Sequence, residues 1–311
     1  MAQNSTSPHP PITAWHRNLL AAAAVVIILL IAMGGVLCAT HSIRTCPDWP
    51  GCFGKIIPPL ETSPILEYTH RLLAALGGLL ILSSAIAGLA RTPRLRWISW
   101  PPLAAIPLLV VVSTFGALVV LRGISPGWAA VDLGTALLVG ALLVTSAVAA
   151  HARGARPDLP DRLAFHSPFA RLALATFGLV YLVFVSGVLV AGPDSITACL
   201  GWPIYSPSLF RLDGHPAGDA LRMAVSLVGL GSLLALLAQA WRGQESHPAA
   251  FRAARRAEAV FLLEIIIQAL LLVCGLNVFL RVAYTVTAAA FWGLLVALVV
   301  TAGLDDGQEI I

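Results

Sequence analysis

The stretch LLAAAAVVIILLIAMGGVLCA, Leu19 to Ala39, contains no charged residue and is long enough to cross a bilayer as one helix. Seven further hydrophobic runs of about 20 residues follow in the chain of 311 residues. Only 11% of the residues are charged, against about 25% in soluble domains, so the chain cannot coat a water-facing surface. We therefore predict an all-α polytopic membrane protein with spanning helices near residues 18–40, 68–90, 98–121, 127–150, 169–191, 217–240, 257–279 and 282–303.

The loops between these spans differ in positive charge. Arginines are concentrated after the second, fourth and sixth spans, whereas the alternate loops carry few. Because positively charged loops stay in the cytoplasm, we predict that both termini are cytoplasmic. The loop with Cys46 and Cys52 then faces outward, where disulfides persist. The net charge of +4 follows from this bias and does not indicate a nucleic-acid partner.

One of the outer loops occurs twice. The sequence CPDWPGC, Cys46 to Cys52, returns as CLGWPIY, Cys199 to Tyr205, at a shift of 153 residues. In the second copy Tyr205 stands where the first has its closing cysteine.

A later repeat extends the similarity. GALVVLR at residues 116–122 resembles GLNVFLR at residues 275–281, at a shift of 159. We therefore predict two pseudo-symmetric four-helix halves, residues 1–150 and 164–311, with a cytoplasmic linker at residues 151–163. An even number of helices in each half makes the repeats parallel.

Ionisable residues within apolar spans are rare and usually functional. Glu67 and His70 lie three residues apart and therefore share a helical face. His70 has three interpretations: a structural histidine paired with Glu67, a metal ligand, or a member of a proton relay. Asp132 lies near the start of the fourth span, and Glu264 and Gln268 lie four apart in the seventh.

The cysteines divide into two groups. Cys46 and Cys52 can close a small loop, either as a simple staple or as a disulfide that exchanges electrons with a partner. Cys38 and Cys274 lie in apolar runs and are interpreted as small core residues. Cys199 has no obvious partner.

The loop CPDWPGC followed by EYTHRL at the start of the second span resembles the heme A synthase family. The resemblance extends from about Gly34 to the end of the eighth span and is stronger in the first half. It implies a bacterial plasma membrane oxidoreductase that converts a methyl group of heme o into the formyl group of heme a, by two hydroxylations and loss of water. It also implies, as partners, heme O synthase, cytochrome oxidase assembly factors and membrane lipid, and it leaves a homo-oligomer open.

The resemblance assigns roles to individual residues. Glu67 matches the functional glutamate of the family, and His70 matches its first axial ligand of the heme iron. Cys46 and Cys52 match the first cysteine pair. Asp132 stands in place of the second axial histidine, where it would be a weak oxygen ligand or leave the iron five-coordinate. Further candidate site residues are Arg44, Arg71 and Arg222.

The second half departs from the family pattern. The second half of the family holds a heme b through histidines on its sixth and eighth helices. In this chain no histidine follows His247, and Leu221–Met223 occupy the position of the family's His-Arg pair. The expected ligands of a C-terminal heme b are therefore missing. Two functions therefore remain open: a divergent heme A synthase with a heme in its first half, and a non-catalytic heme-binding or assembly subunit. A third is a proton-coupled carrier with Glu67, His70 and Asp132 as its relay.

Overall fold

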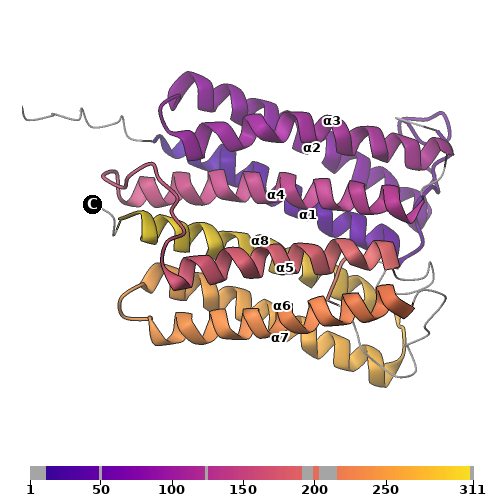
Figure 1. Ribbon diagram of the computed structural model, residues 1–311. Helices are drawn as coiled ribbons and strands as arrows, with labels where there is room; N and C mark the ends of the chain where they lie inside the picture. Colours follow the sequence, from indigo (N-terminus) through magenta and orange to yellow (C-terminus); the bar gives the residue numbers. More distant parts are fainter. Residues whose placement is uncertain (1–11, 49–50, 123–124, 191–198, 203–215, 309–311) are drawn as a thin grey trace, which may run out of the picture.

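The computed structural model describes residues 12–48, 51–122, 125–190, 199–202 and 216–308. Within these residues the chain forms eight helices and no strand (Figure 1). All eight are long and apolar enough to cross a membrane, which confirms the predicted all-helical class. The helices are α1 (Ala14–Ala39), α2 (Thr62–Arg91), α3 (Arg96–Arg122), α4 (Pro126–Ala155), α5 (Pro168–Val190), α6 (Pro216–Arg242), α7 (Pro248–Cys274) and α8 (Val278–Gln308).

The same packing pattern occurs among the four helices of each half, and each set of four is called a bundle below. Consecutive helices pack together and the first packs against the fourth, so that α2 and α4, and likewise α6 and α8, occupy opposite corners. The bundles join through α1 and α4, which pack against α8, and through α4, which also packs against α5. Figure 1 accordingly shows these four helices between the pair α2 and α3 and the pair α6 and α7.

The helices of the second half follow those of the first at a nearly constant spacing. α5 and α6 each begin 154 residues after α1 and α2, and α7 and α8 each begin 152 residues after α3 and α4. The two stretches that resemble each other at a shift of 159 therefore do not occupy equivalent places in the helices. Residues 116–122 complete α3, whereas residues 275–281 include the break between α7 and α8. Gly275 ends α7 with φ of 80°, a left-handed conformation that glycine adopts readily.

Trp292 of α8 lies at the junction of the two bundles. Its ring is fully buried and stacks on Phe177 of α5, with 4.9 Å between the ring centroids. Its indole N–H donates to the carbonyl of Leu137 in α4 at 3.1 Å, which satisfies a buried donor and fixes α8 against α4. Nearby, a Cβ on Gly35 of α1 would lie 2.8 Å from Cβ of Thr285, so the two backbones approach closely.

The predicted linker, residues 151–163, begins inside α4, which continues to Ala155. Asp161 accepts hydrogen bonds from the first backbone N–H groups of α3. Asp306 of α8 does the same for the two N–H groups that precede α5. Because the first N–H groups of a helix have no partner within it, both carboxylates stabilise helix starts at this end of the bundle.

Candidate functional site

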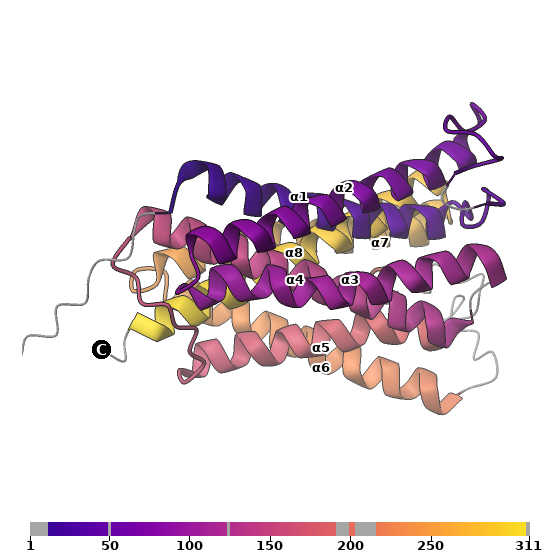
Figure 2. The same ribbon diagram turned by 90° about the horizontal axis from the view of Figure 1, so that it is seen from above.

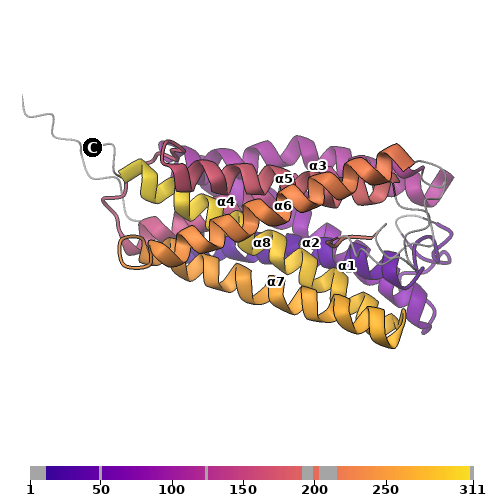
Figure 3. The ribbon, with the colours of Figure 1, turned by 60° about the horizontal axis from the view of Figure 1, so that its bottom comes forward.

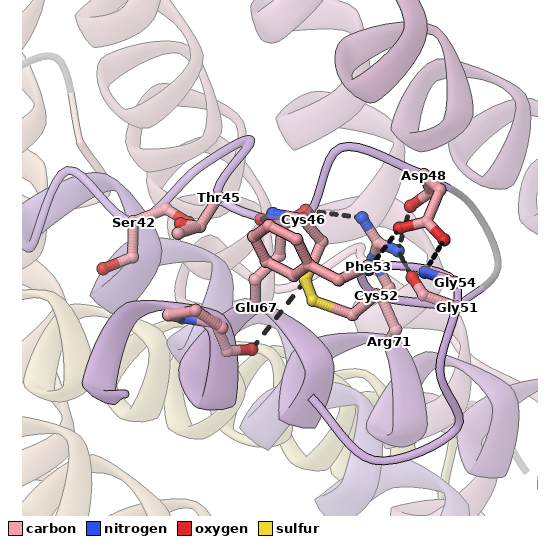
Figure 4. Close-up of a disulfide and its surroundings, with 11 residues drawn as sticks. Ser42, Thr45, Cys46, Asp48, Gly51, Cys52, Phe53, Gly54, Glu67 and Arg71 are labelled. Atoms are coloured by element: carbon pink, nitrogen blue, oxygen red, sulfur yellow. Dashed lines mark hydrogen bonds and ion pairs between the residues drawn. A yellow bond between two sulfur atoms is a disulfide. The ribbon is translucent and has the colours of Figure 1, made fainter. Parts of the chain in front are cut away.

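The Cys46–Cys52 loop folds back over the first turns of α2 (Figure 4). The two cysteines form a disulfide with their Cα atoms 4.8 Å apart, as predicted, and both are buried. Sγ of Cys46 lies 3.9 Å from the carbonyl oxygen of Pro64 in α2. The closed loop therefore packs on the helix that carries the candidate site. Trp49 of this loop, and Tyr205 of the second copy, lie outside the described residues.

Glu67 joins this loop to the helix. Its Oε2 accepts the backbone N–H of Cys46 at 2.8 Å, and its Oε1 accepts Nη2 of Arg71 at 2.6 Å. Arg71 also donates to the carbonyls of Asp48 and Gly51 (Figure 4). Only 4% of Glu67 is exposed, and a charge so buried requires partners of this kind. The loop and the start of α2 are thus held by one connected set of bonds.

Asp48 shapes the far side of the loop. Its carboxylate accepts the backbone N–H groups of Gly54 at 2.6 Å and Phe53 at 2.7 Å. These bonds, with that from Gly54 the stronger cause, hold the pKa of Asp48 below its usual value. Phe53 and Gly54 have φ of 57° and 65°. The carboxylate therefore stabilises a left-handed turn that phenylalanine rarely adopts.

His70 lies one turn after Glu67. Its Nδ1 is buried and has no hydrogen-bond partner in the described part of the chain. Gly34 of α1 lies beside the ring, where a Cβ would be 3.6 Å from Cε1. Both oxygens of Glu67 bond to other groups, so Glu67 acts on His70 through its charge and not through a hydrogen bond between described atoms. An unpaired buried nitrogen is costly, and the imidazole is available to a ligand.

Asp132 lies in the second turn of α4, at the corner of the bundle opposite α2. Its side chain is half-buried and forms no hydrogen bond or ion pair with another described residue. The remaining candidates lie elsewhere. Arg44 is exposed in the loop, and Arg222 is buried in α6 of the other half. The structure therefore brings together the loop, Glu67 and Arg71, and it places Asp132 on the facing helix.

The helices α2 and α3 diverge toward the end with the Cys46–Cys52 loop (Figure 2). At the other end they are close, since a Cβ on Gly88 would lie 3.1 Å from Cα of Ser99. Further along α3, Gly116 is exposed, and a Cβ there would meet no atom within 4 Å.

Trp202 fills the corresponding interior of the second bundle. Its ring packs edge-on against Phe261 of α7, 5.5 Å between centroids, and its Cη2 would lie 3.3 Å from a Cβ on Gly229 of α6. Its backbone N–H donates to Glu264 of α7 at 2.9 Å, and its carbonyl accepts the hydroxyl of Tyr284 in α8. Side chains of the protein therefore occupy the centre of this bundle.

The spacing of the helix starts places the counterparts of His70 and Asp132 near Ala224 and Tyr284. Ala224 directly follows the predicted Leu221–Met223. Alanine offers no ligand atom, and the hydroxyl of Tyr284 is already bonded. The second bundle does not fit a heme held between α6 and α8.

Replacing Trp202 with alanine is expected to lower the free energy of unfolding by about 3–5 kcal/mol, the usual cost of removing a buried tryptophan. Denaturant unfolding of the purified protein in detergent measures this change. Trp100→Ala is the matched control because 64% of Trp100 is exposed, and we expect a change within about 0.5 kcal/mol. Equal effects of the two changes would show that Trp202 is not a packing element.

A second disulfide joins Cys38 at the end of α1 to Cys199, with their Cα atoms 5.7 Å apart. The interpretation of Cys38 as a core residue, and of Cys199 as a cysteine without a partner, is therefore wrong. Cys274 is free and exposed, which corrects its assignment to the core. The predicted topology already indicated this bond, because it places Cys38 and Cys199 at the same outer face of the membrane.

The family model for cytochrome oxidase assembly proteins, COX15-CtaA, matches residues 17–296. The chain belongs to this family. Heme A synthase of Symbiobacterium thermophilum is 28% identical over 259 residues, which cover 79% of this chain and 82% of the relative. The enzyme of that name from Geobacillus thermodenitrificans is 25% identical over 282 residues, 85% of this chain and 84% of the relative.

A third relative is matched over less of its length. Heme A synthase of Alkalihalophilus pseudofirmus is 27% identical over 184 residues, 58% of this chain. The match spans about three fifths of that relative, 61% of its length.

Proposed function

We propose that this protein acts in heme a biosynthesis as a membrane oxidoreductase that converts a methyl group of heme o into a formyl group. Membership of the family and the heme A synthases among its relatives support this proposal. The observation that carries it is the imidazole of His70, whose buried Nδ1 has no hydrogen-bond partner among the described residues and which lies one turn from the anchored carboxylate of Glu67.

The first bundle would hold the substrate heme between α2 and α4. His70 would bind its iron, and Asp132 on the facing helix would offer a weaker oxygen ligand. The bound heme supplies the iron at which oxygen chemistry takes place. Binding through Nδ1 would break no hydrogen bond with the part of the chain that the structure describes.

Glu67 would accept and release a proton at Oε1 as the methyl group is oxidised. Oε1 is the oxygen paired with Arg71, whereas Oε2 is fixed by the N–H of Cys46. When Oε1 takes a proton, Arg71 still has the carbonyls of Asp48 and Gly51 as acceptors. The loop therefore keeps the arginine satisfied in both protonation states.

The proposed setting is a bacterial plasma membrane with the Cys46–Cys52 loop on its outer face. The asymmetry of the arginine-bearing loops supports this orientation. The disulfides support it as well, because such bonds persist in oxidising surroundings. Heme O synthase would supply the substrate, and cytochrome oxidase assembly would receive the product.

A non-catalytic heme-binding or assembly subunit is the second candidate. Trp202 favours it, because a bundle filled by this residue leaves no place for a second heme to deliver electrons. A synthase of this kind would take its electrons by another route.

We expect the protein, purified from a host that makes heme o, to contain one heme per chain, as heme o or heme a. Visible spectra and pyridine-hemochrome analysis measure the amount and type. His70→Ala should lose this heme, whereas His41→Ala, a change to an exposed loop histidine, should retain it. Wild-type protein without heme would reject the proposal, and two hemes per chain would contradict the account of the second bundle. Bound heme o with no formation of heme a would favour the non-catalytic subunit.

A further inference from the structure

A cavity of about 810 Å³ lies at the end of the molecule away from the Cys46–Cys52 loop. It is an open cavity lined by the last turns of α4 and α8 and the first turns of α7. Figure 3 shows the turn between α6 and α7 and the end of α8 together at this end. Part of its wall is apolar and formed by small residues, among them Ala147, Ala152, Ala253 and Ala297.

Basic side chains gather around the same cavity. Those that line it are Arg156, Arg252, Arg256, His151 and His247. Asp305 is the acidic residue among its described lining, and it lies 3.8 Å from Arg156. The charge of Asp305 is therefore offset by Arg156, and the charges of Arg252 and Arg256 remain.

Arg252 and Arg256 form no hydrogen bond or ion pair with any residue that the structure describes. They lie four apart on α7, a spacing at which like charges repel across one helical face. Other charged residues of α7 do have partners. Arg255 lies over an aromatic ring, and Glu258 accepts the indole N–H of Trp241. The two arginines of this part of α7 that lack a described partner, Arg252 and Arg256, are therefore the two that line the cavity.

The start of α7 adds to the positive field. His247 at the N-cap makes no side-chain capping bond, and the first turn contains no acidic residue. A helix N-terminus of this kind favours an anion. His247, Pro248 and Ala249 all line the cavity, so the helix start and the two arginines act on the same space.

We propose that this cavity binds an anionic phospholipid, with its phosphate between Arg252 and Arg256 and an acyl chain against the alanine-lined wall. A phospholipid matches both the charge and the apolar wall, whereas a free anion would use only the charge. This end is also the predicted cytoplasmic side, where basic pockets between helices bind acidic head groups. The proposal does not depend on the heme chemistry at the opposite end.

The test compares phosphatidylglycerol with phosphatidylcholine of the same acyl chains, added to the full-length protein in detergent. Native mass spectrometry counts the bound lipids, and thermal unfolding reports their effect on stability. We expect wild-type protein to bind phosphatidylglycerol preferentially and to unfold at a higher temperature with it. The double change Arg252→Gln and Arg256→Gln should reduce this preference by about 10- to 30-fold.

Two control variants separate the site from general charge. Arg255→Gln removes a neighbouring arginine that does not line the cavity and should leave the preference unchanged. Arg252→Lys with Arg256→Lys keeps the charge and should retain most of the binding. Because it replaces the same two arginines, retained binding would show that the glutamine variant loses the lipid through lost charge and not through a folding defect. Equal binding of the two lipids, or a preference that survives the glutamine changes, would overturn the proposal. Displacement of the lipid by inorganic phosphate would assign the site to a free anion instead.

Discussion

Replacing Glu67 with glutamine is expected to lower the formation of heme a by about 10²- to 10⁴-fold, the range for loss of a general acid or base. Glutamine keeps an oxygen that can accept the N–H of Cys46, so the loop remains attached. It cannot take up a proton at the position of Oε1 or pair with Arg71 as an anion. The measurement is the ratio of heme a to heme o, extracted from a host that makes heme o and has no synthase of its own.

The effect must be separated from damage to the fold. Alanine is the poorer choice at this position, because it would leave the buried N–H of Cys46 without an acceptor. The glutamine variant should still bind heme and still contain the Cys46–Cys52 disulfide. Glu61→Gln, at an exposed carboxylate that caps α2 without a side-chain bond, should leave heme a unchanged. Normal heme a formation by the Glu67 variant would show that this carboxylate only positions the loop.

Hydropathy was sufficient to predict the eight helices, because a long apolar run in a membrane must satisfy its backbone hydrogen bonds internally. It located their ends less well. The seventh span was predicted at residues 257–279, whereas α7 runs from Pro248 to Cys274. The helix continues through Arg252 and Arg256, which hydropathy excludes, and it ends where Gly275 takes a positive φ.

The spacing of Glu67 and His70 was enough to place them on one face of a helix, and this part of the site depends on local geometry alone. The anchoring of Glu67 by the N–H of Cys46 could not be predicted in this way, because it requires the loop to fold back on α2. The same limit applies to Trp202, whose position depends on side chains from α6, α7 and α8 together.

Loss of the Cys38–Cys199 disulfide is expected to destabilise the protein more than loss of the Cys46–Cys52 disulfide. The two bonds join residues 161 and 6 positions apart, respectively. Loop-closure entropy then gives a stabilisation of about 5 kcal/mol for the longer connection and about 2 kcal/mol for the shorter one. Denaturant unfolding of Cys199→Ser and Cys46→Ser in detergent measures both, with Cys274→Ser as a control that removes a free, exposed thiol.

The same two variants should rank in the opposite order for heme a formation. Cys199 tethers the segment before Trp202 to the end of α1, so its loss loosens the packing between the halves but leaves Glu67 and Arg71 in place. The backbone N–H of Cys46 holds Glu67, and Cys46 is itself held by the disulfide to Cys52. Without the disulfide the loop can move, so the hydrogen bond to Glu67 is no longer held in place. The double change Cys38→Ser and Cys199→Ser should match the single Cys199 variant, since the remaining thiol has no further role. If Cys46→Ser proved the less harmful to heme a, the disulfide would not be needed to hold Glu67 in place.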